Sequence, residues 1–328
     1  MGQGATPLKG VRVSFGTAIE LGLIDCLQKD APTTAYLFLI NNGCRGKCAF
    51  CPQSIGISKN ISRVSWPEFP VEEVLKGLRK NRRFRRICLQ CADEEGLMNW
   101  LPCFVESLRD KTDIPISISM PPAPHEDLRV LKVAGIDVLT IPLDCADEEL
   151  FRRVKGRDWG SHWRALEKAL EIFGPNNVGT HIIAGLGETE RDIVNLVSKC
   201  HRIGIMSSLF AFTPIMGTPL WGRPQPDLRS YRRLQLAREL IISGRATERD
   251  FTYDSLGRIV SINICRDEVE DVIEEGEAFM TRGCPSCNRP YFNEKVTGPI
   301  YNYPRKLESK EVEEIRRELF GGFEGLKV

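Results

Sequence analysis

Three cysteines near the start of the chain have the types and spacing of a metal-binding loop. Cys44, Cys48 and Cys51 are spaced C-x3-C-x2-C and directly follow an apolar, strand-like run at 35–40. Thiolates are soft ligands that suit zinc and iron–sulfur clusters. No fourth cysteine or histidine lies nearby in the sequence to close the tetrahedron of a structural zinc ion. The spacing therefore favours an iron–sulfur cluster with one iron left open.

A second group of cysteines lies near the other end of the chain. Cys284 and Cys287 form a C-x2-C turn, and Cys265 ends a predicted strand that could bring it close to them. Three thiolates without a nearby fourth cysteine or histidine favour a second iron–sulfur cluster over zinc, and zinc over a redox disulfide. The candidates for an atypical fourth ligand are Arg258, Ser261 and Ser286.

Short β-rich runs that alternate with amphipathic helices must position these cysteines. Such alternation predicts β/α units around a parallel sheet, with the chemistry at the carboxyl ends of the strands. The predicted strands span 35–40, 86–91, 114–120, 138–143, 178–184, 207–212, 258–264 and 278–282. The predicted helices span 70–78, 99–108, 126–134, 161–173, 189–203, 230–243, 269–275 and 310–320.

These elements predict an α/β fold, a complete or near-complete eight-stranded (β/α) barrel of the TIM type with extensions at both ends. Residues 1–34 are expected to be a leader, in which the apolar positions between 11 and 26 have helical spacing. The barrel is expected to span 35–305 and to include the second cysteine segment. Residues 306–328 are expected to form a helical tail.

Composition narrows the class of partner and the compartment. Lys and Arg number 45 against 44 Asp and Glu, so the balance of charge gives no reason to expect a nucleic acid. The sequence contains neither an uncharged apolar run of membrane-spanning length nor a signal peptide, so no membrane is expected. Twelve cysteines with metal-like spacings therefore indicate a reducing, cytoplasmic setting.

Polar or flexible residues also follow two other predicted strands. Asp144 comes after the fourth strand, and Gly185, Gly187 and Glu188 come after the fifth. The glycines permit close backbone approach, and an acidic residue at a helix start is common in any α/β protein. Among the histidines, His125 and His162 are expected at the surface, whereas His181 could face a cofactor or simply pack.

The motifs together resemble the radical S-adenosylmethionine superfamily. The cysteine loop, with the aromatic Phe50 before its last cysteine, is similar to the loop in which three cysteines of that family bind a [4Fe-4S] cluster. In that family the open iron chelates the methionine part of S-adenosylmethionine. The stretches 51–54, 185–189 and 212–220 are similar to segments of biotin synthases. The resemblance implies that Phe50, Gly185 and Glu188 line the cofactor site, with Asp144, the candidate catalytic residue, by the ribose and the substrate.

The second cysteine group adds a finer resemblance. Biotin synthases hold a sacrificial second cluster on inner barrel strands with three cysteines and one arginine, and this chain keeps only Cys88 at those positions. The auxiliary cluster is therefore expected on Cys265, Cys284 and Cys287, similar in kind to that of lipoyl synthases. The segment 284–290 resembles subunits of the two-component lipoyl synthases of archaea and some bacteria.

This resemblance implies sulfur insertion at unactivated carbons of an octanoyl group carried by a lipoyl carrier protein, such as the glycine cleavage H protein. It also implies an electron donor such as ferredoxin or flavodoxin and a sister radical S-adenosylmethionine subunit. One alternative is a biotin synthase-like enzyme acting on a free small molecule, or another radical enzyme that forms C–C or C–S bonds. An alternative of another class is an iron–sulfur scaffold or electron carrier. The basic run 79–86 is read as a solvated helix end, with docking of an acidic carrier protein as the other reading.

Overall fold

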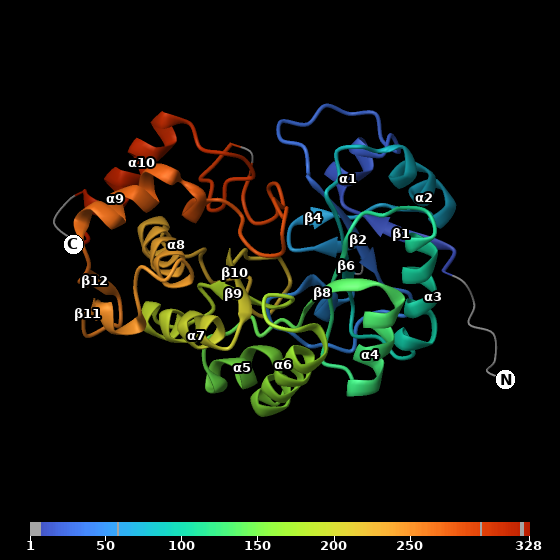
Figure 1. Ribbon diagram of the computed structural model, residues 1–328, viewed down its shortest axis with the longest axis horizontal. Helices are drawn as coiled ribbons and strands as arrows, with labels where there is room; N and C mark the ends of the chain where they lie inside the picture. The colour runs from blue at the N-terminus through green and yellow to red at the C-terminus, as the bar shows by residue number, and fades with distance from the viewer. Residues whose placement is uncertain (1–7, 58, 296, 322–324) are drawn as a thin grey trace.

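An open sheet of eight strands forms the centre of the molecule, and six of its strands run parallel (Figure 1). The computed structural model describes residues 8–57, 59–295, 297–321 and 325–328. The strand order is β10-β9-β8-β7-β6-β2-β1-β5, and within those residues no pairing joins β10 to β5. The parallel strands are β2 (Thr34–Leu39), β6 (Arg86–Cys91), β7 (Ile116–Ser119), β8 (Ile136–Thr140), β9 (Val178–Ala184) and β10 (Ile205–Ala211). The antiparallel edge strands are β1 (Gly10–Val13) and β5 (Glu68–Pro70).

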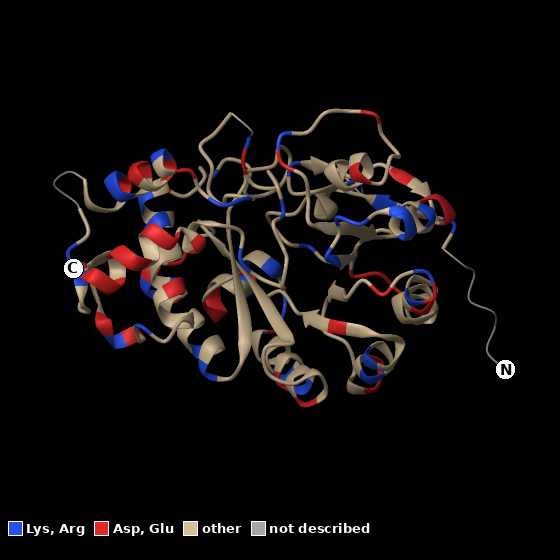
Figure 2. Cartoon of the chain, turned by 45° about the horizontal axis from the view of Figure 1, so that its top comes forward, with Lys and Arg blue, Asp and Glu red and all other residues tan. Residues whose placement is uncertain are grey.

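Helices follow most of the parallel strands and cover the outer face of the sheet (Figure 1). The helices of the described residues are α1 (Phe15–Glu20), α2 (Val71–Lys80), α3 (Leu97–Arg109), α4 (His125–Ala134), α5 (Glu148–Lys155), α6 (Trp159–Phe173), α7 (Glu190–Arg202), α8 (Leu228–Ile242), α9 (Arg266–Glu275) and α10 (Ser309–Phe320). Of these, α9 and α10 pack on α8. Short 3-10 helices are η1 (Pro52–Ile55), η2 (Glu248–Asp250) and η3 (Glu277–Phe279), and two-stranded ribbons pair β3 (Asn60–Ile61) with β4 (Val64–Ser65) and β11 (Phe251–Tyr253) with β12 (Ile259–Ile262). Figure 2 shows positive and negative side chains interspersed along the outer helices. In the described residues, no helix has the length and apolarity needed to cross a membrane.

Each strand has an apolar side and a more polar side, because successive side chains point to opposite faces. On β6, Ile87 and Leu89 belong to the hydrophobic core, whereas Arg86, Cys88 and Gln90 line the inside of the barrel. On β7, Ile116 and Ile118 likewise belong to the core, whereas Ser117 and Ser119 line the inside. The polar inner face is therefore fixed by the same alternation that buries the helices, and it is this face that holds the site.

The predicted α/β class and (β/α) barrel are confirmed, but the barrel is partial and open where a complete or near-complete eight-stranded TIM-type barrel was predicted. Antiparallel β1 and β5 take the places of the last two predicted strands. The predicted strand 258–264 contains β12, which pairs with β11 outside the main sheet, because the Asp254 side chain closes a tight turn onto the backbone N–H groups of Leu256 and Arg258. The predicted strand 278–282 contains part of η3 and a single bridge between Met280 and Tyr303.

The expected leader also differs in structure from its prediction. Residues 10–13 form β1, in which Val11 and Val13 are buried, and β1 pairs with β2. Only six residues of the expected helix, Phe15–Glu20, are helical, and Ser14 caps them. The apolar spacing was compatible with both structures, and the alternation at 11–13 was the deciding signal. The tail prediction matches α10, although residues 1–7 and 322–324 lie outside the described part.

Candidate active site

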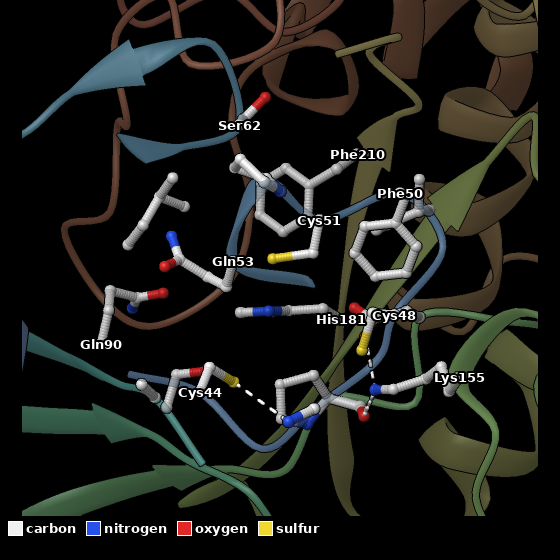
Figure 3. A pocket seen from close by; sticks show the side chains of 18 of the residues that line it. Cys44, Cys48, Phe50, Cys51, Gln53, Ser62, Gln90, Lys155, His181 and Phe210 are labelled. Atoms are coloured by element: carbon white, nitrogen blue, oxygen red, sulfur yellow. Dashed lines mark hydrogen bonds and ion pairs between the residues drawn. The ribbon is translucent and has the colours of Figure 1, made fainter. Parts of the chain in front are cut away.

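The three cysteines of the first motif line one cavity at the carboxyl ends of the parallel strands. This cavity has a volume of about 250 Å³, and we call it the upper cavity. Figure 3 shows the sulfur atoms of Cys44, Cys48 and Cys51 turned towards a common space, with Phe50 and His181 beside it. The position agrees with the rule that α/β barrels carry their chemistry at this end.

Backbone contacts to neighbouring loops fix the course of the cysteine loop. The buried Glu94 accepts hydrogen bonds from the backbone N–H groups of Asn41 (2.7 Å) and Asn42 (3.2 Å) through Oε2. The Ala49 N–H donates to the carbonyl of Val154 at 2.8 Å. The loop is thus tied to the end of β6 and to α5, so the cysteines keep their positions relative to the strands.

The surroundings of the thiols fit an iron–sulfur cluster. Burial raises the pKa of the Cys48 thiol and raises that of Cys51 to about 12. Thiols in such a site become thiolates when a cation binds them. The Gly46 N–H donates to Cys44 Sγ at 3.3 Å, and a Cβ on Gly46 would stand 3.2 Å from that sulfur. Backbone N–H donors of this kind stabilise cluster-bound sulfur.

The ligands of a single ion and those of a cluster are arranged differently. Among the residues that the structure describes, no three Cys, His, Asp or Glu side chains meet closely enough to hold one metal ion. The cysteines of a cluster bind different iron atoms and stand around a core. A cluster at this loop would be held by Cys44, Cys48 and Cys51, as the spacing predicts.

A buried ion pair forms another wall of the upper cavity. Asp144 Oδ2 lies 2.5 Å from Lys155 Nζ, and that ammonium also donates to the Pro142 carbonyl at 2.6 Å. Burial lowers the pKa of Lys155, but the Asp144 carboxylate outweighs it and the net shift is upward, so Lys155 is charged. Asp144 itself has a left-handed backbone, φ +66°, and hydrogen-bonds to β9 on both sides. Lys155 also lowers the pKa of the neighbouring Cys48 against the larger effect of burial.

A second set of charges flanks the cysteine loop. Asp93 accepts hydrogen bonds from Arg45 (2.7 Å) and from Arg157, and Asp93 and Arg157 line the upper cavity. Burial raises the pKa of Asp93, but the two guanidinium groups have the larger combined effect. The pKa of Asp93 is therefore lowered overall. The cavity wall therefore offers both carboxylates and cations. Such a wall can bind a ligand that carries charges of both signs.

The remaining residues predicted to line the cofactor site lie in different places. Phe50 lines the upper cavity, whereas Gly185 and Glu188 do not belong to its wall. Glu188 Oε1 accepts a hydrogen bond from the Gly185 N–H at 2.5 Å, so the carboxylate closes its own turn. Gly185 has φ +104°, and a Cβ there would stand 3.0 Å from Pro226 Cδ. The structure thus gives these two residues the task of shaping the turn after β9.

Two histidines face the upper cavity. His181, on β9, lines it, and burial lowers its pKa to about 3, so the ring is neutral. His162 was expected at the surface but is buried and lines the same cavity, with its pKa lowered by burial to about 4. It lies one turn into α6, on the face that packs against the barrel, which the helical spacing with Trp163 and Leu166 could have indicated.

The second cysteine motif is brought together with a different partner from the one expected. Cys284 and Cys287 line an inner cavity below the upper one, and Cys88 of β6 lines it with them. Cys265 is exposed at the start of α9 and belongs to neither cavity wall. Of the three suggested fourth ligands, Arg258 is an exposed residue paired with Asp254, and Ser261, on β12, hydrogen-bonds to Asn263. Ser286 lies in the turn itself, where its carbonyl accepts hydrogen bonds from Thr33 and Thr34.

Several residues of the site were not found from the sequence. Lys155 lies on α5, a helix that the sequence analysis missed, although Asp147 caps it and Gly156 ends it. Asp93 and Arg157 had no motif around them. All twelve cysteines lie in the described residues, and all are free thiols.

Comparisons with known proteins agree with this geometry. Residues 38–200 match the family model for the radical SAM superfamily. The chain is 25% identical over 191 residues to a biotin synthase of Persephonella marina, covering 56% of each chain. It is 24% identical over 261 residues to a biotin synthase of Prochlorococcus marinus, covering 77% of each. The chain spans about half the length of several curated relatives that it matches.

Solved structures agree on the fold. Methylornithine synthase superposes with a TM-score of 0.52 at 16% identity, covering 86% of this chain and 80% of that one. The FeFe-hydrogenase maturase HydG from Carboxydothermus hydrogenoformans gives a TM-score of 0.52 at 18% identity, covering 87% and 66%. At these identities the likeness supports the shared architecture alone.

Proposed function

From the premise that this chain is a radical SAM enzyme, distantly similar to biotin synthases, we propose that it inserts sulfur at unactivated C–H positions. We further propose that the substrate is an octanoyl group on a lipoyl carrier protein. When bound, a [4Fe-4S] cluster with an open iron supplies the electron that cleaves S-adenosylmethionine to a 5′-deoxyadenosyl radical, and an auxiliary cluster supplies sulfide.

One observation carries this proposal: the cavities lined by the two groups of thiols adjoin each other inside the barrel. The upper cavity and the inner cavity have five wall residues in common, Gln90, Ser119, His181, Phe210 and Arg289. A carbon radical formed in the upper cavity would lie next to the group of thiols that could hold a sulfur source. A non-catalytic electron carrier would not need such a space next to both groups.

The residues of the chain have separate tasks in this proposal. Cys44, Cys48 and Cys51 would hold the first cluster, and Phe50 would cover it. Lys155 and Asp144 would orient charged groups of the cofactor, because their own pairing fixes both side chains at the wall. His181 is neutral and buried, so it would line the radical's path without taking up a proton.

The proposed substrate and partners rest on the second cysteine motif. The segment 284–290 resembles two-component lipoyl synthases, which supports the carrier-bound octanoyl group, a sister subunit and a ferredoxin or flavodoxin as electron donor. The basic run gives no further support for carrier docking. Arg79, Lys80, Arg82, Arg83 and Arg85 are exposed, but they lie before β6, at the end of the barrel away from the upper cavity.

Hydrogen transfer tests the proposal even if sulfur insertion needs a second subunit. Reconstituted protein is incubated anaerobically with S-adenosylmethionine, reductant and a carrier peptide bearing a deuterated octanoyl group. Deuterium in the 5′-deoxyadenosine, read by mass spectrometry, is the expected result, and the Cys44→Ala/Cys48→Ala/Cys51→Ala variant forms no 5′-deoxyadenosine. Transfer from free deuterated octanoate but not from the peptide would favour the small-molecule alternative. Protein with the first cluster loaded that forms no 5′-deoxyadenosine would favour the electron carrier.

A further inference from the structure

We propose that Cys88, Cys284 and Cys287 hold the auxiliary iron–sulfur cluster inside the barrel, beside the guanidinium groups of Arg86 and Arg289. That the ligand is a cluster rests on the proposed function. The choice of ligands rests on the structure, and it excludes Cys265. The inner cavity is lined by all five of these residues.

The strand register puts the cysteine of β6 at the centre of the group. Tyr36 on β2 pairs with Cys88, and Cys88 pairs with Ser117 on β7, so the three side chains form one row across the inner face. The Tyr36 hydroxyl lies 3.4 Å from Cys287 Sγ. The Ser117 side chain opposes the rise that burial causes in the pKa of both Cys88 and Cys284, so it lies beside both thiols. The row therefore connects the strand cysteine to both cysteines of the turn.

The turn that carries the other two cysteines is fastened to the amino ends of β2 and β6. Arg86 Nε donates to the Pro285 carbonyl at 3.0 Å, and the Thr33 and Thr34 hydroxyls donate to the Ser286 carbonyl at 2.7 and 2.9 Å. A Cβ on Gly283 would stand 2.5 Å from Ser208 Oγ, so the turn lies close against β10. The turn thus plugs the lower end of the barrel.

The turn also has room to adjust. The inner cavity is narrow, about 20 Å³. On the other side of the turn lies a cavity of about 510 Å³, which is lined by residues 283–287 and the start of β10. Outward movement of the turn into this space would widen the inner cavity for a cluster. Ser207, whose buried Oγ has no hydrogen-bond partner in the described residues, lies on the wall of the outer space.

The positive charge of the inner cavity favours the binding of an anion. Arg86 Nη1 and Arg289 Nε are buried and have no hydrogen-bond partner among the described residues. The Arg289 guanidinium is held between the rings of Phe210 (4.6 Å) and Phe292 (4.8 Å). No carboxylate is among the described residues that line this cavity. A cluster held by three thiolates is anionic and would satisfy both cations.

Hydrogen-bond donors converge on the sulfur atoms, as they do on cluster thiolates. Gln90 Nε2 donates to Cys88 Sγ at 2.9 Å. The Arg289 N–H donates to the Tyr36 hydroxyl at 2.7 Å, so the single hydroxyl proton of Tyr36 is free to point at Cys287 Sγ. Burial raises the pKa of Cys284, and Arg86, Thr140 and Ser117 act against that rise. A neutral thiol is a weak acceptor that would not need these donors.

Iron analysis in a background without the first cluster tests the ligand set without using activity. The Cys44→Ala/Cys48→Ala/Cys51→Ala protein, reconstituted anaerobically, should retain iron and sulfide with a cluster-type Mössbauer spectrum. Adding Cys88→Ser, Cys284→Ser or Cys287→Ser should remove most of that iron. Adding Cys265→Ser, the matched control, should remove none.

Two results would overturn the assignment. One is a loss of the remaining iron with Cys265→Ser while Cys88→Ser keeps it. The other is the absence of any iron in the starting triple variant. Because cysteine variants can misfold, each is also made with the first cluster intact, where continued 5′-deoxyadenosine formation reports a folded barrel.

A gentler variant adds an independent readout. Tyr36→Phe should keep the iron but lower the reduction potential of the second cluster, because hydrogen bonds to cluster sulfur raise that potential. An unchanged potential would contradict the contact between Tyr36 and a cluster ligand. Failure of the proposed sulfur insertion would leave these iron and potential measurements unaffected.

Discussion

At the scale of single residues, the site depends on charges that the fold has removed from water. Asp144 and Lys155 are both buried, and each is the other's ion-pair partner. A buried pair gains little over an apolar pair, but a single buried charge without its partner is costly. The pair therefore holds the wall of the upper cavity in place mainly through the cost of breaking it.

Lys155→Ala is expected to reduce the free energy of unfolding by about 3–5 kcal/mol, because it leaves the Asp144 carboxylate buried and unpaired. Urea unfolding of the wild type and the variant measures this loss. The double variant Asp144→Asn/Lys155→Met keeps the side-chain volume and removes both charges. Its loss in the free energy of unfolding should be clearly smaller than that of Lys155→Ala. An equal loss in both variants would show that packing, and not the ion pair, is responsible.

The buried carboxyl of Glu294 is expected to make the stability of the folded protein depend on pH. Burial raises the pKa of its carboxyl to about 7, whereas the unfolded chain titrates near 4.5. Between these values the folded protein binds the extra proton, so stability falls as pH rises through this window and levels off above about pH 7. The fall contributed by this group is about 3 kcal/mol.

Glu294→Gln removes that group. The stability of the variant relative to the wild type should therefore increase as pH rises from 5 to 8. Urea midpoints at both pH values measure the difference, and titrations shared by the two proteins cancel. A constant difference between the two proteins across this range would mean that Glu294 does not titrate there.

At the scale of elements, the turn after β9 resembles a cofactor-binding motif in sequence, but the contacts of its side chains stabilise the turn itself. Gly185 adopts φ +104° and lies against Pro226 and Phe212, and Glu188 accepts a hydrogen bond from the Gly185 N–H of the same turn. The turn sets where β9 ends, and it thereby positions Ile183 on the cavity wall.

Gly185→Ala is therefore expected to destabilise the protein by about 1–2 kcal/mol or more, because an L-residue at this φ is strained and its Cβ meets Pro226. Gly222→Ala is the matched control, since no atom lies within 4 Å of its Cβ position. Thermal unfolding compares the two. Equal midpoints would contradict the structural role given to Gly185.

The sequence predicted most elements because the alternation of apolar residues follows the burial of each strand and helix. The ranges of β6 and β9 agree with their predictions. The order of pairing was not predictable in the same way. Residues 259–262 read as a barrel strand, but their partner is the nearby β11, and only the three-dimensional contacts decide between the two.

The site was predictable where ligands are close in sequence and not where they are far apart. Cys44, Cys48 and Cys51 share one loop, so their spacing sufficed. The partner of Cys284 and Cys287 was misjudged, because proximity in sequence favoured Cys265 while strand register brings in Cys88, about 200 positions away. Cys88 was visible as an inward position of β6, but nothing in the sequence connected it to the turn.

At the scale of the whole molecule, the partial barrel joins two thiol groups that enter from its opposite ends. The cysteine loop covers the carboxyl ends of the strands, and the 283–289 turn plugs the amino ends. The inner side chains of the parallel strands form the wall between them. Successive side chains of a strand point to opposite faces. The outward side chains therefore pack against the helices, while the inward side chains line the two cavities.

The origin of the product's sulfur tests this arrangement most directly. Protein reconstituted with heavy-isotope sulfide, freed of excess reagent, is turned over with the octanoyl-carrier peptide in buffer that contains light sulfide, and the product is read by mass spectrometry. We predict heavy sulfur in the product, and no thiolated product from Cys88→Ser, which still cleaves S-adenosylmethionine. Light sulfur in the product, or undiminished thiolation by Cys88→Ser, would contradict the claim that the two groups act on one substrate inside one barrel.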